Sequence, residues 1–281
     1  MTTRHPERFG LYNNHNIPEQ QRLQEPAMVR HWNEVTLREL GYLLKPGIRF
    51  VDAGAGPNSS LSEALQSRGI KYIPFDIRPN HIEQRKKSDS SVGSNESYAH
   101  VANVNSPALP RDFADIYLMR FVLEHLPQNQ WHNALVQAMK HTCGSVVVMM
   151  HDWSTLASTT HPEFIEVFRR QSSVFAQQTG IELYPRKKLA TAVINTSKDG
   201  WKHDHVLQRL FTVSRPQGWY GEEFMIMAQV QATMAHDFLG DHELGTFFDK
   251  AATFFTVKAK KSNPIQFQPP SIVISILQRG L

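Results

Sequence analysis

The chain has 281 residues, of which 41% are hydrophobic and 20% charged, a balance that fits an ordinary globular protein with one large domain and additions. The formal net charge is +4, but the basic clusters lack interleaved aromatic residues, and this pattern disfavours a nucleic-acid partner. A single cysteine, Cys143, excludes an internal disulfide, and the polar start of the chain with only a short central apolar run, Val146 to Met150, predicts a cytoplasmic protein outside membranes.

The first predicted element is a helix that begins near Pro18, after an irregular stretch rich in Asn, His, Pro and Gln. Apolar residues then recur at spacings that approximate one helical face: Leu23, Met28, Trp32, Val35, Leu37, Leu40 and Leu44. Lys45-Pro-Gly47 ends the helix. We therefore divide the chain into an N-terminal helical segment, residues 1–45, and a main domain over residues 46–281.

A strand, a tight turn and a helix are predicted within Arg49 to Gln66. Asp52 stands at the end of a short apolar run, and Gly54 and Gly56 follow it one residue apart. Glycines at such a turn let the backbone approach a ligand, because no Cβ blocks it. In an α/β sheet this is the place where a nucleotide binds.

The same turn lacks the dinucleotide fingerprint Gly-x-Gly-x-x-Gly. Ser59 stands where the third glycine would be, and Pro57 removes a backbone N–H donor. Asp52 would repel a pyrophosphate, whereas it would attract an ammonium group. The stretch therefore predicts a cationic ligand and not a polyphosphate.

A second strand, Lys71 to Asp76, ends in a carboxylate about 20 residues beyond Gly56, the spacing at which a βαβ unit places an acid over a ribose. We predict that Asp76 binds the sugar of the ligand. Residues 80–97 are polar and charged, and we expect an exposed, mobile insertion without chemistry there. A third strand is expected over Tyr98 to Asn105.

The fourth predicted strand, Asp115 to Arg120, runs directly into Phe121-Val-Leu-Glu-His-Leu-Pro127. Ligands of open α/β sheets lie at the carboxyl ends of the strands, so Arg120 and Phe121 should border the ligand. Phe121 could lie against a positive charge as a cation–π partner, or it could pack under the following helix.

The fifth predicted strand, Gly144 to Met150, is continuously apolar, as a central parallel strand should be. It carries His151 and Asp152 to the ligand edge of the sheet. Because histidine exchanges protons near neutral pH, His151 is the first candidate for a general base and His125 the second. Asp152 would orient the base or bind the substrate.

The remaining predicted elements are helices over His161–Gly180, Lys187–Ile194, Pro216–Gly240 and Phe247–Val257, a strand within His205–Val213 and a strand over Ser271–Leu277. They complete a doubly wound α/β domain with seven strands and a helical insertion before the last strand. His203 and His205 alternate on a strand, but no further ligand stands at a usable spacing, so we predict no metal site.

Three of these features resemble the class I S-adenosylmethionine-dependent methyltransferases: Asp52-x-Gly54-x-Gly56, the acid Asp76, and the string from Arg120 to Pro127. The string is the most specific, because it repeats the Arg-Trp-Val-Leu-Glu-His-Leu-Pro of one subgroup with Phe121 in place of tryptophan. The resemblance implies S-adenosyl-L-methionine as the cofactor and a mainly parallel sheet whose last strand is antiparallel. It also implies methyl transfer to an oxygen or nitrogen of a small molecule, as in secondary metabolism.

The resemblance implies further cofactor-binding residues. The segment before the glycine turn looks like a lid in which Tyr12 and Arg22 help to hold the methionine end of the cofactor, together with Asp52. Family members usually carry an acid or amide after the third strand that bonds the adenine amino group. Asn105 takes that place here, with Asn103 as the second choice.

Three other functions stay open. The basic pI of about 9.1 allows a methyltransferase that acts on RNA or protein. A protein that kept the fold but lost turnover would bind the cofactor without methyl transfer. An NAD-dependent oxidoreductase shares the fold, although Asp52, Pro57 and Ser59 oppose it.

Overall fold

The structure is a computed structural model that describes residues 26–58, 60–91, 99–158, 160–196, 201–209, 219–259, 267–268 and 270–280. The chain divides into two compact units. The sheet unit comprises Leu23–Met150, Pro185–Gln208 and Val273–Leu281, and the helical unit includes His151–Tyr184 and Arg209–Ile272. Each unit is described by itself below.

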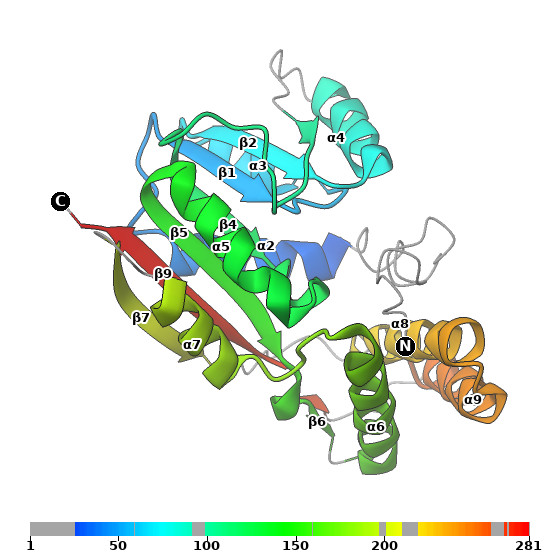
Figure 1. Cartoon of the computed structure of the whole chain (residues 1–281). Helices are drawn as coiled ribbons and strands as arrows, with labels where there is room; N and C mark the ends of the chain where they lie inside the picture. Colours follow the sequence, from blue (N-terminus) through cyan, green and yellow to red (C-terminus); the bar gives the residue numbers. More distant parts are fainter. Residues whose placement is uncertain are drawn as a thin grey trace. The chain divides into compact units, whose positions relative to one another are not determined.

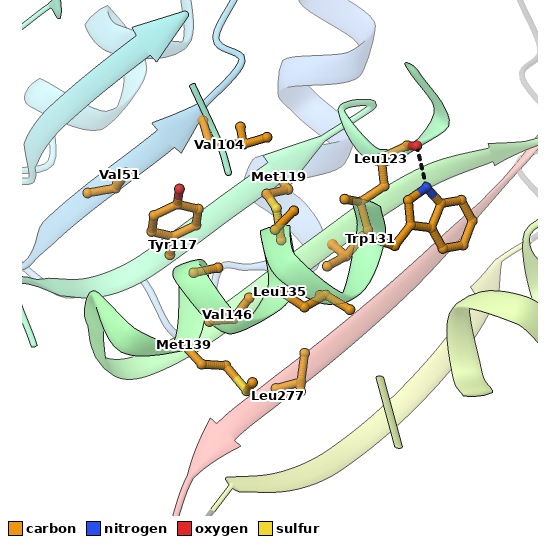
Figure 2. Close-up of a cluster of buried hydrophobic side chains, with 14 of the residues drawn as sticks. Val51, Val104, Tyr117, Met119, Leu123, Trp131, Leu135, Met139, Val146 and Leu277 are labelled. Carbon is orange, nitrogen blue, oxygen red and sulfur yellow. Dashed lines mark hydrogen bonds between the residues drawn. The ribbon is translucent and has the colours of Figure 1, made fainter. Parts of the chain in front are cut away.

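A seven-stranded sheet has the order β3-β2-β1-β4-β5-β9-β7 (Figure 1). Its strands are β1 (Arg49–Ala53), β2 (Lys71–Asp76), β3 (His100–Val101), β4 (Ala114–Arg120), β5 (Thr142–Asp152), β7 (Trp201–Arg209) and β9 (Ser271–Arg279). β1 pairs in parallel with β2 and β4, as β2 does with β3 and β4 with β5. Figures 1 and 2 show β9 running opposite to β5. The predicted fold, mainly parallel with a reversed last strand, is therefore confirmed.

The strand order reverses between β1 and β4. β2 and β3 lie on one side of β1, and β4, the next strand along the chain, lies on the other side. Such a switch point opens a crevice at the carboxyl ends of the two strands, because the connections leave in opposite directions. β1 ends at Ala53 and β4 at Arg120. The glycine turn and the Phe121 segment therefore both start at this edge of the sheet.

The helices of the sheet unit are α2 (Pro26–Glu39), α3 (Ser60–Gln66), α4 (Pro79–Ser91), α5 (Gln128–Lys140) and α7 (Arg186–Thr196), with a 3-10 turn η2 at Leu123–His125. α5 buries Trp131, Ala134, Leu135 and Ala138, which recur at helical spacing and so form one apolar face. This face packs with side chains of β1, β4 and β5 in the main core, which Figure 2 shows.

Trp131 anchors the turn that follows β4. Its indole Nε1 donates to the carbonyl oxygen of Leu123 at 2.8 Å, drawn in Figure 2, and to that of Leu126 at 3.2 Å. The ring is fully buried, so these bonds satisfy a donor that would otherwise be costly. The segment from Arg120 to Pro127 is therefore held from its far end by α5.

The helical unit contains α6 (Pro162–Thr179), α8 (Trp219–Thr233), the π-helix η4 (Met234–Leu239) and α9 (His242–Ala259), with the 3-10 turn η3 (Trp153–Thr155) and the antiparallel pair β6 (Ala157–Ser158) and β8 (Phe267–Gln268). Its core is aromatic and includes Phe164, Phe168, Phe248 and Phe255. Among the helices in the described ranges, none is long and apolar enough to cross a membrane.

Several sequence predictions need correction. The prediction of an exposed insertion over residues 80–97 is wrong for its first part. Pro79–Ser91 forms helix α4, which buries His81, Ile82 and Arg85. The third strand shrinks to His100–Val101, and the strand expected within His205–Val213 begins earlier, at Trp201. The small β6–β8 pair was not predicted.

Candidate functional site

The glycine turn joins β1 to α3 in a conformation that requires glycine. Gly54 has φ +68° and Gly56 φ +64°, in the left-handed region that side chains rarely adopt. The N–H groups of Gly54 and Ala55 donate to the carbonyl oxygen of Phe75 at 2.8 and 3.0 Å. The turn is thus tied to the end of β2.

The two glycines differ in the space around them. A Cβ at Gly54 would lie 2.5 Å from Cγ2 of Val122, whereas at Gly56 no described atom lies within 4 Å of that position. Gly54 is therefore needed for close packing against the segment after β4. Gly56 leaves open space, as a turn that admits a ligand should.

Asp52 is buried in the middle of the sheet, between Pro74 of β2 and Leu118 of β4. Its Oδ2 accepts a hydrogen bond of 2.6 Å from the Tyr72 hydroxyl. Burial raises the pKa of the Tyr72 phenol, so the hydroxyl stays protonated and remains a donor. A buried carboxylate needs such a partner, and sequence reasoning missed Tyr72 because an aromatic strand residue is ordinarily core.

Asp76 is brought to the glycine turn, as the 20-residue spacing predicts. Its Oδ2 accepts from the Gly56 N–H at 2.9 Å, and its Oδ1 accepts from the Arg78 N–H at 2.9 Å. His81 Nδ1 lies 3.4 Å from the same Oδ1. Burial alone would raise the pKa of the Asp76 carboxyl, but the contact with His81 and the two backbone donors outweigh it and lower that pKa from its ordinary value.

This pKa shift predicts a pH dependence of folding. Because the folded-state pKa of Asp76 is lowered, its ionised form stabilises the fold at and above the ordinary aspartate pKa. That contribution should disappear as the pH falls through the lower folded-state pKa. Thermal unfolding of the wild type and Asp76→Asn between about pH 7 and pH 3 should show a difference in Tm that is constant near neutrality and shrinks below about pH 4. A difference that grows on acidification would contradict the assignment.

Arg85 of α4 also bonds the turn. Its Nε donates to the Gly56 carbonyl oxygen at 2.6 Å and its Nη2 to that of Ala55 at 2.7 Å. The side chain is fully buried, and its guanidinium lies 5.7 Å from the centroid of the Tyr72 ring. The sequence signal was hidden, because Arg85 opens an Arg-Lys-Lys cluster of which the other two members are exposed.

The two asparagines proposed for adenine are bonded to each other and to α5. The Asn103 Oδ1 accepts from the Asn105 N–H at 2.9 Å. The Asn105 amide donates to Gln130 Oε1 at 3.1 Å, and its Oδ1 accepts from Asn133 at 3.1 Å. Asn105 is thus fixed by α5, and its Oδ1 keeps a second lone pair. An adenine contact for either residue stays a prediction.

Phe121 has a strained backbone at the carboxyl end of β4. Its φ is +59°, which is rare for a bulky residue, and its N–H donates to the Met149 carbonyl oxygen at 2.7 Å. The ring packs edge-on against Trp32 of α2, with centroids 5.3 Å apart. Backbone strain of this kind concentrates at functional sites. A position of Phe121 beside the ligand stays a prediction.

Arg120 reaches α2. Its Nη1 donates to Asn33 Oδ1 at 2.8 Å and to Thr36 Oγ1 at 3.2 Å. These bonds fix the helix to the end of β4, and a direct contact of Arg120 with a ligand stays a prediction.

The candidate general bases lie in different units. His125 belongs to the sheet unit, and its Nε2 lies 3.9 Å from Oε1 of the buried Glu124. His151 belongs to the helical unit, is buried, and has its ring 5.3 Å from that of Trp153. The choice of base stays a prediction.

Asp152 has a local structural role that the sequence analysis did not assign. Its Oδ1 accepts from the N–H and the hydroxyl of Ser154, at 3.1 and 2.6 Å, and so caps η3. Tyr12 and Arg22 lie outside the described residues. In the part of the chain that the structure covers, no group of three or more His, Cys, Asp or Glu side chains could hold a metal ion.

Comparison with known proteins identifies the family. The model of a family described as "Methyltransferase domain" matches residues 23–196, more than half of the chain. No curated protein sequence matches. Among solved structures, the cyclopropane synthase MmaA2 of Mycobacterium tuberculosis superposes with a TM-score of 0.54 at 12% identity, covering 89% of this chain and 83% of that one.

Two further solved structures contain S-adenosylhomocysteine. Geranyl diphosphate C-methyltransferase of Streptomyces coelicolor A3(2) has a TM-score of 0.51 at 11% identity, covering 96% of this chain and 87% of that one. Phosphoethanolamine N-methyltransferase 2 of Haemonchus contortus has a TM-score of 0.50 at 14% identity, covering 89% of this chain and 52% of that one. At these identities the structural likeness shows the fold. With the family match it confirms the resemblance found in the sequence: the chain belongs to the methyltransferase-domain family, and it is a class I S-adenosylmethionine-dependent methyltransferase.

Proposed function

We propose that this methyltransferase acts on an oxygen or nitrogen of a small molecule. The observation that supports the donor site is that one buried carboxylate, Asp76, bonds the glycine turn, while a second, Asp52, is buried two residues before that turn on the neighbouring strand. Two of the solved structures support a small-molecule acceptor, since they contain geranyl diphosphate and phosphomonomethylethanolamine.

The residues of the sheet unit fit S-adenosylmethionine. Asp52 would attract the ammonium group of its methionine part, and Asp76, held ionised, would accept hydrogen bonds from the ribose hydroxyls. The left-handed glycines let the backbone come close, and Gly56 leaves room for it. When bound, S-adenosylmethionine supplies a methyl group on a positively charged sulfur.

The task left to the protein is alignment. A nucleophile has to approach the methyl group on the side opposite to the sulfur, and holding it there accounts for most of the catalysis in such a displacement. An amine nucleophile that is already neutral requires no base, whereas a hydroxyl requires one. We propose His151, with His125 as the second candidate, for removal of that proton.

Calorimetric titration followed by a turnover assay tests this function. We expect the wild type to bind S-adenosylmethionine and S-adenosylhomocysteine but not NAD. We also expect S-adenosylhomocysteine to form when S-adenosylmethionine is supplied with a panel of small amines, phenols and alcohols. RNA and a protein mixture serve as separate arms. Product formation with those polymers alone would overturn the small-molecule proposal, and binding without turnover in every arm would favour a non-catalytic protein.

A further inference from the structure

Arg85 is a fully buried arginine on a helix for which the sequence predicted no chemistry. Two of its nitrogens bond two successive carbonyl oxygens of the glycine turn, at 2.6 and 2.7 Å. The third, Nη1, is buried without a hydrogen-bond partner among the residues described. All the hydrogen bonds described for the guanidinium therefore go to the turn.

Packing alone does not explain this burial. Taking a guanidinium out of water costs several kcal/mol unless it is well paired, so a leucine would fill the same space at lower cost. What a leucine cannot do is donate to the Ala55 and Gly56 carbonyl groups. Bonds from a charged, planar fork are stronger and more directional than those between neutral groups. The arginine is therefore explained by what it does to the turn.

Both backbone polar groups of Gly56 are hydrogen-bonded. Its N–H is bonded by Asp76 and its carbonyl oxygen by Arg85. His81, which contacts Asp76, and Arg85 are four residues apart on α4 and so lie on the same face of that helix. One face of α4 thus supports both the carboxylate and the turn.

The second carboxylate is connected to the same group. The Arg85 guanidinium lies over the ring of Tyr72, and the Tyr72 hydroxyl donates to Asp52. A cation on an aromatic face fixes the orientation of the ring as well as attracting it. Arg85 is therefore connected, directly or through one neighbour, to the glycine turn and to both carboxylates, Asp52 and Asp76.

We propose that Arg85 is a positioning residue that sets the glycine turn in its cofactor-binding shape before the cofactor arrives. This inference rests on the proposed cofactor site. Arg85 need not touch the cofactor to act in this way, because its bonds go to carbonyl oxygens of the turn. Loss of Arg85 should weaken cofactor binding, because the turn would have to be ordered during binding, and it should leave methyl transfer from the bound cofactor nearly unchanged.

Calorimetric binding of S-adenosylhomocysteine tests the proposal without knowledge of the acceptor. Arg85→Met keeps the volume and removes every donor, and we expect its Kd to rise about 10- to 100-fold. Arg85→Lys keeps the charge but lacks the planar fork that bonds two carbonyl groups. Its Kd should therefore lie between those of the wild type and Arg85→Met. Lys87→Gln removes a charge from an exposed position of the same helix and should change Kd less than about twofold.

A general loss of stability has to be separated from positioning. Leu135→Ala lowers stability from within the main core and should leave Kd near the wild-type value. Without cofactor, the Gly56 amide should exchange its hydrogen faster in Arg85→Met than in the wild type. If Arg85→Met does not fold, Arg85→Lys serves for the same comparison. Wild-type affinity in the Arg85 variants, or an equal loss of affinity in Leu135→Ala at matched Tm, would overturn the proposal while leaving the cofactor site intact. Failure of the wild type to bind S-adenosylhomocysteine would instead refute the proposed function itself.

Discussion

Replacing Gly54 by alanine is expected to lower the free energy of unfolding by about 2 to 4 kcal/mol and to abolish measurable cofactor binding. Two costs add together. The φ of +68° is strained for any side chain, and the new Cβ would stand 2.5 Å from Cγ2 of Val122. Because Val122 is β-branched and follows the fixed Phe121, the turn itself has to move. Denaturant unfolding and S-adenosylhomocysteine titration measure the two effects.

Gly56→Ala is the matched control for this substitution. Gly56 has nearly the same φ, +64°, but no described atom near the position of a Cβ, so only the backbone cost of about 1 to 2 kcal/mol should appear. Adding Val122→Ala to Gly54→Ala should restore part of the lost stability in a double-mutant cycle. Equal losses in Gly54→Ala and Gly56→Ala would show that the overlap with Val122 does not matter.

Asp76→Ala should weaken the binding of S-adenosylhomocysteine by about 1 to 3 kcal/mol, roughly 5- to 150-fold in Kd. The carboxylate is held ionised and would accept bonds from the ribose hydroxyls. Its removal also frees the Gly56 N–H, which it now bonds at 2.9 Å. Both changes act in the same direction, and isothermal titration at constant pH reports their sum.

Asp76→Asn separates the two contributions, because an amide oxygen can still accept from the Gly56 N–H but carries no charge. Its affinity should lie between those of the wild type and Asp76→Ala. A nucleoside such as adenosine, which has the ribose but no methionine part, should lose affinity to the same degree as S-adenosylhomocysteine. An Asp76→Ala protein with wild-type affinity would remove Asp76 from the ribose site.

The sequence predicted those parts of the site that depend on chain geometry. In a parallel sheet the carboxyl ends of neighbouring strands meet at one edge, so the spacing from Gly56 to Asp76 was sufficient to bring the two together. The cap that Asp152 forms with Ser154 was not predicted, although it is local and an aspartate two residues before a serine could have indicated it.

The parts that were missed depend on tertiary contacts. Residues 80–97 appeared exposed because charged residues are rarely buried, and nothing local distinguishes Arg85 from Lys86. Only the position of the glycine turn makes one of them a buried donor. Asn105 could likewise be assigned from its position after the third strand, but its bonds to α5 could not be foreseen from the sequence.

The backbone of Phe121 is strained at the edge of the sheet where we propose the cofactor. A ring is kept at a position where φ is +59° and where glycine would release about 1 to 2 kcal/mol of strain. Glycine would also lose the contact of the ring with Trp32 of α2, so replacing Phe121 relieves the backbone but weakens packing. If the ring lies beside the ligand, as we propose, the replacement would lower turnover as well, and selection for turnover would keep the strained residue.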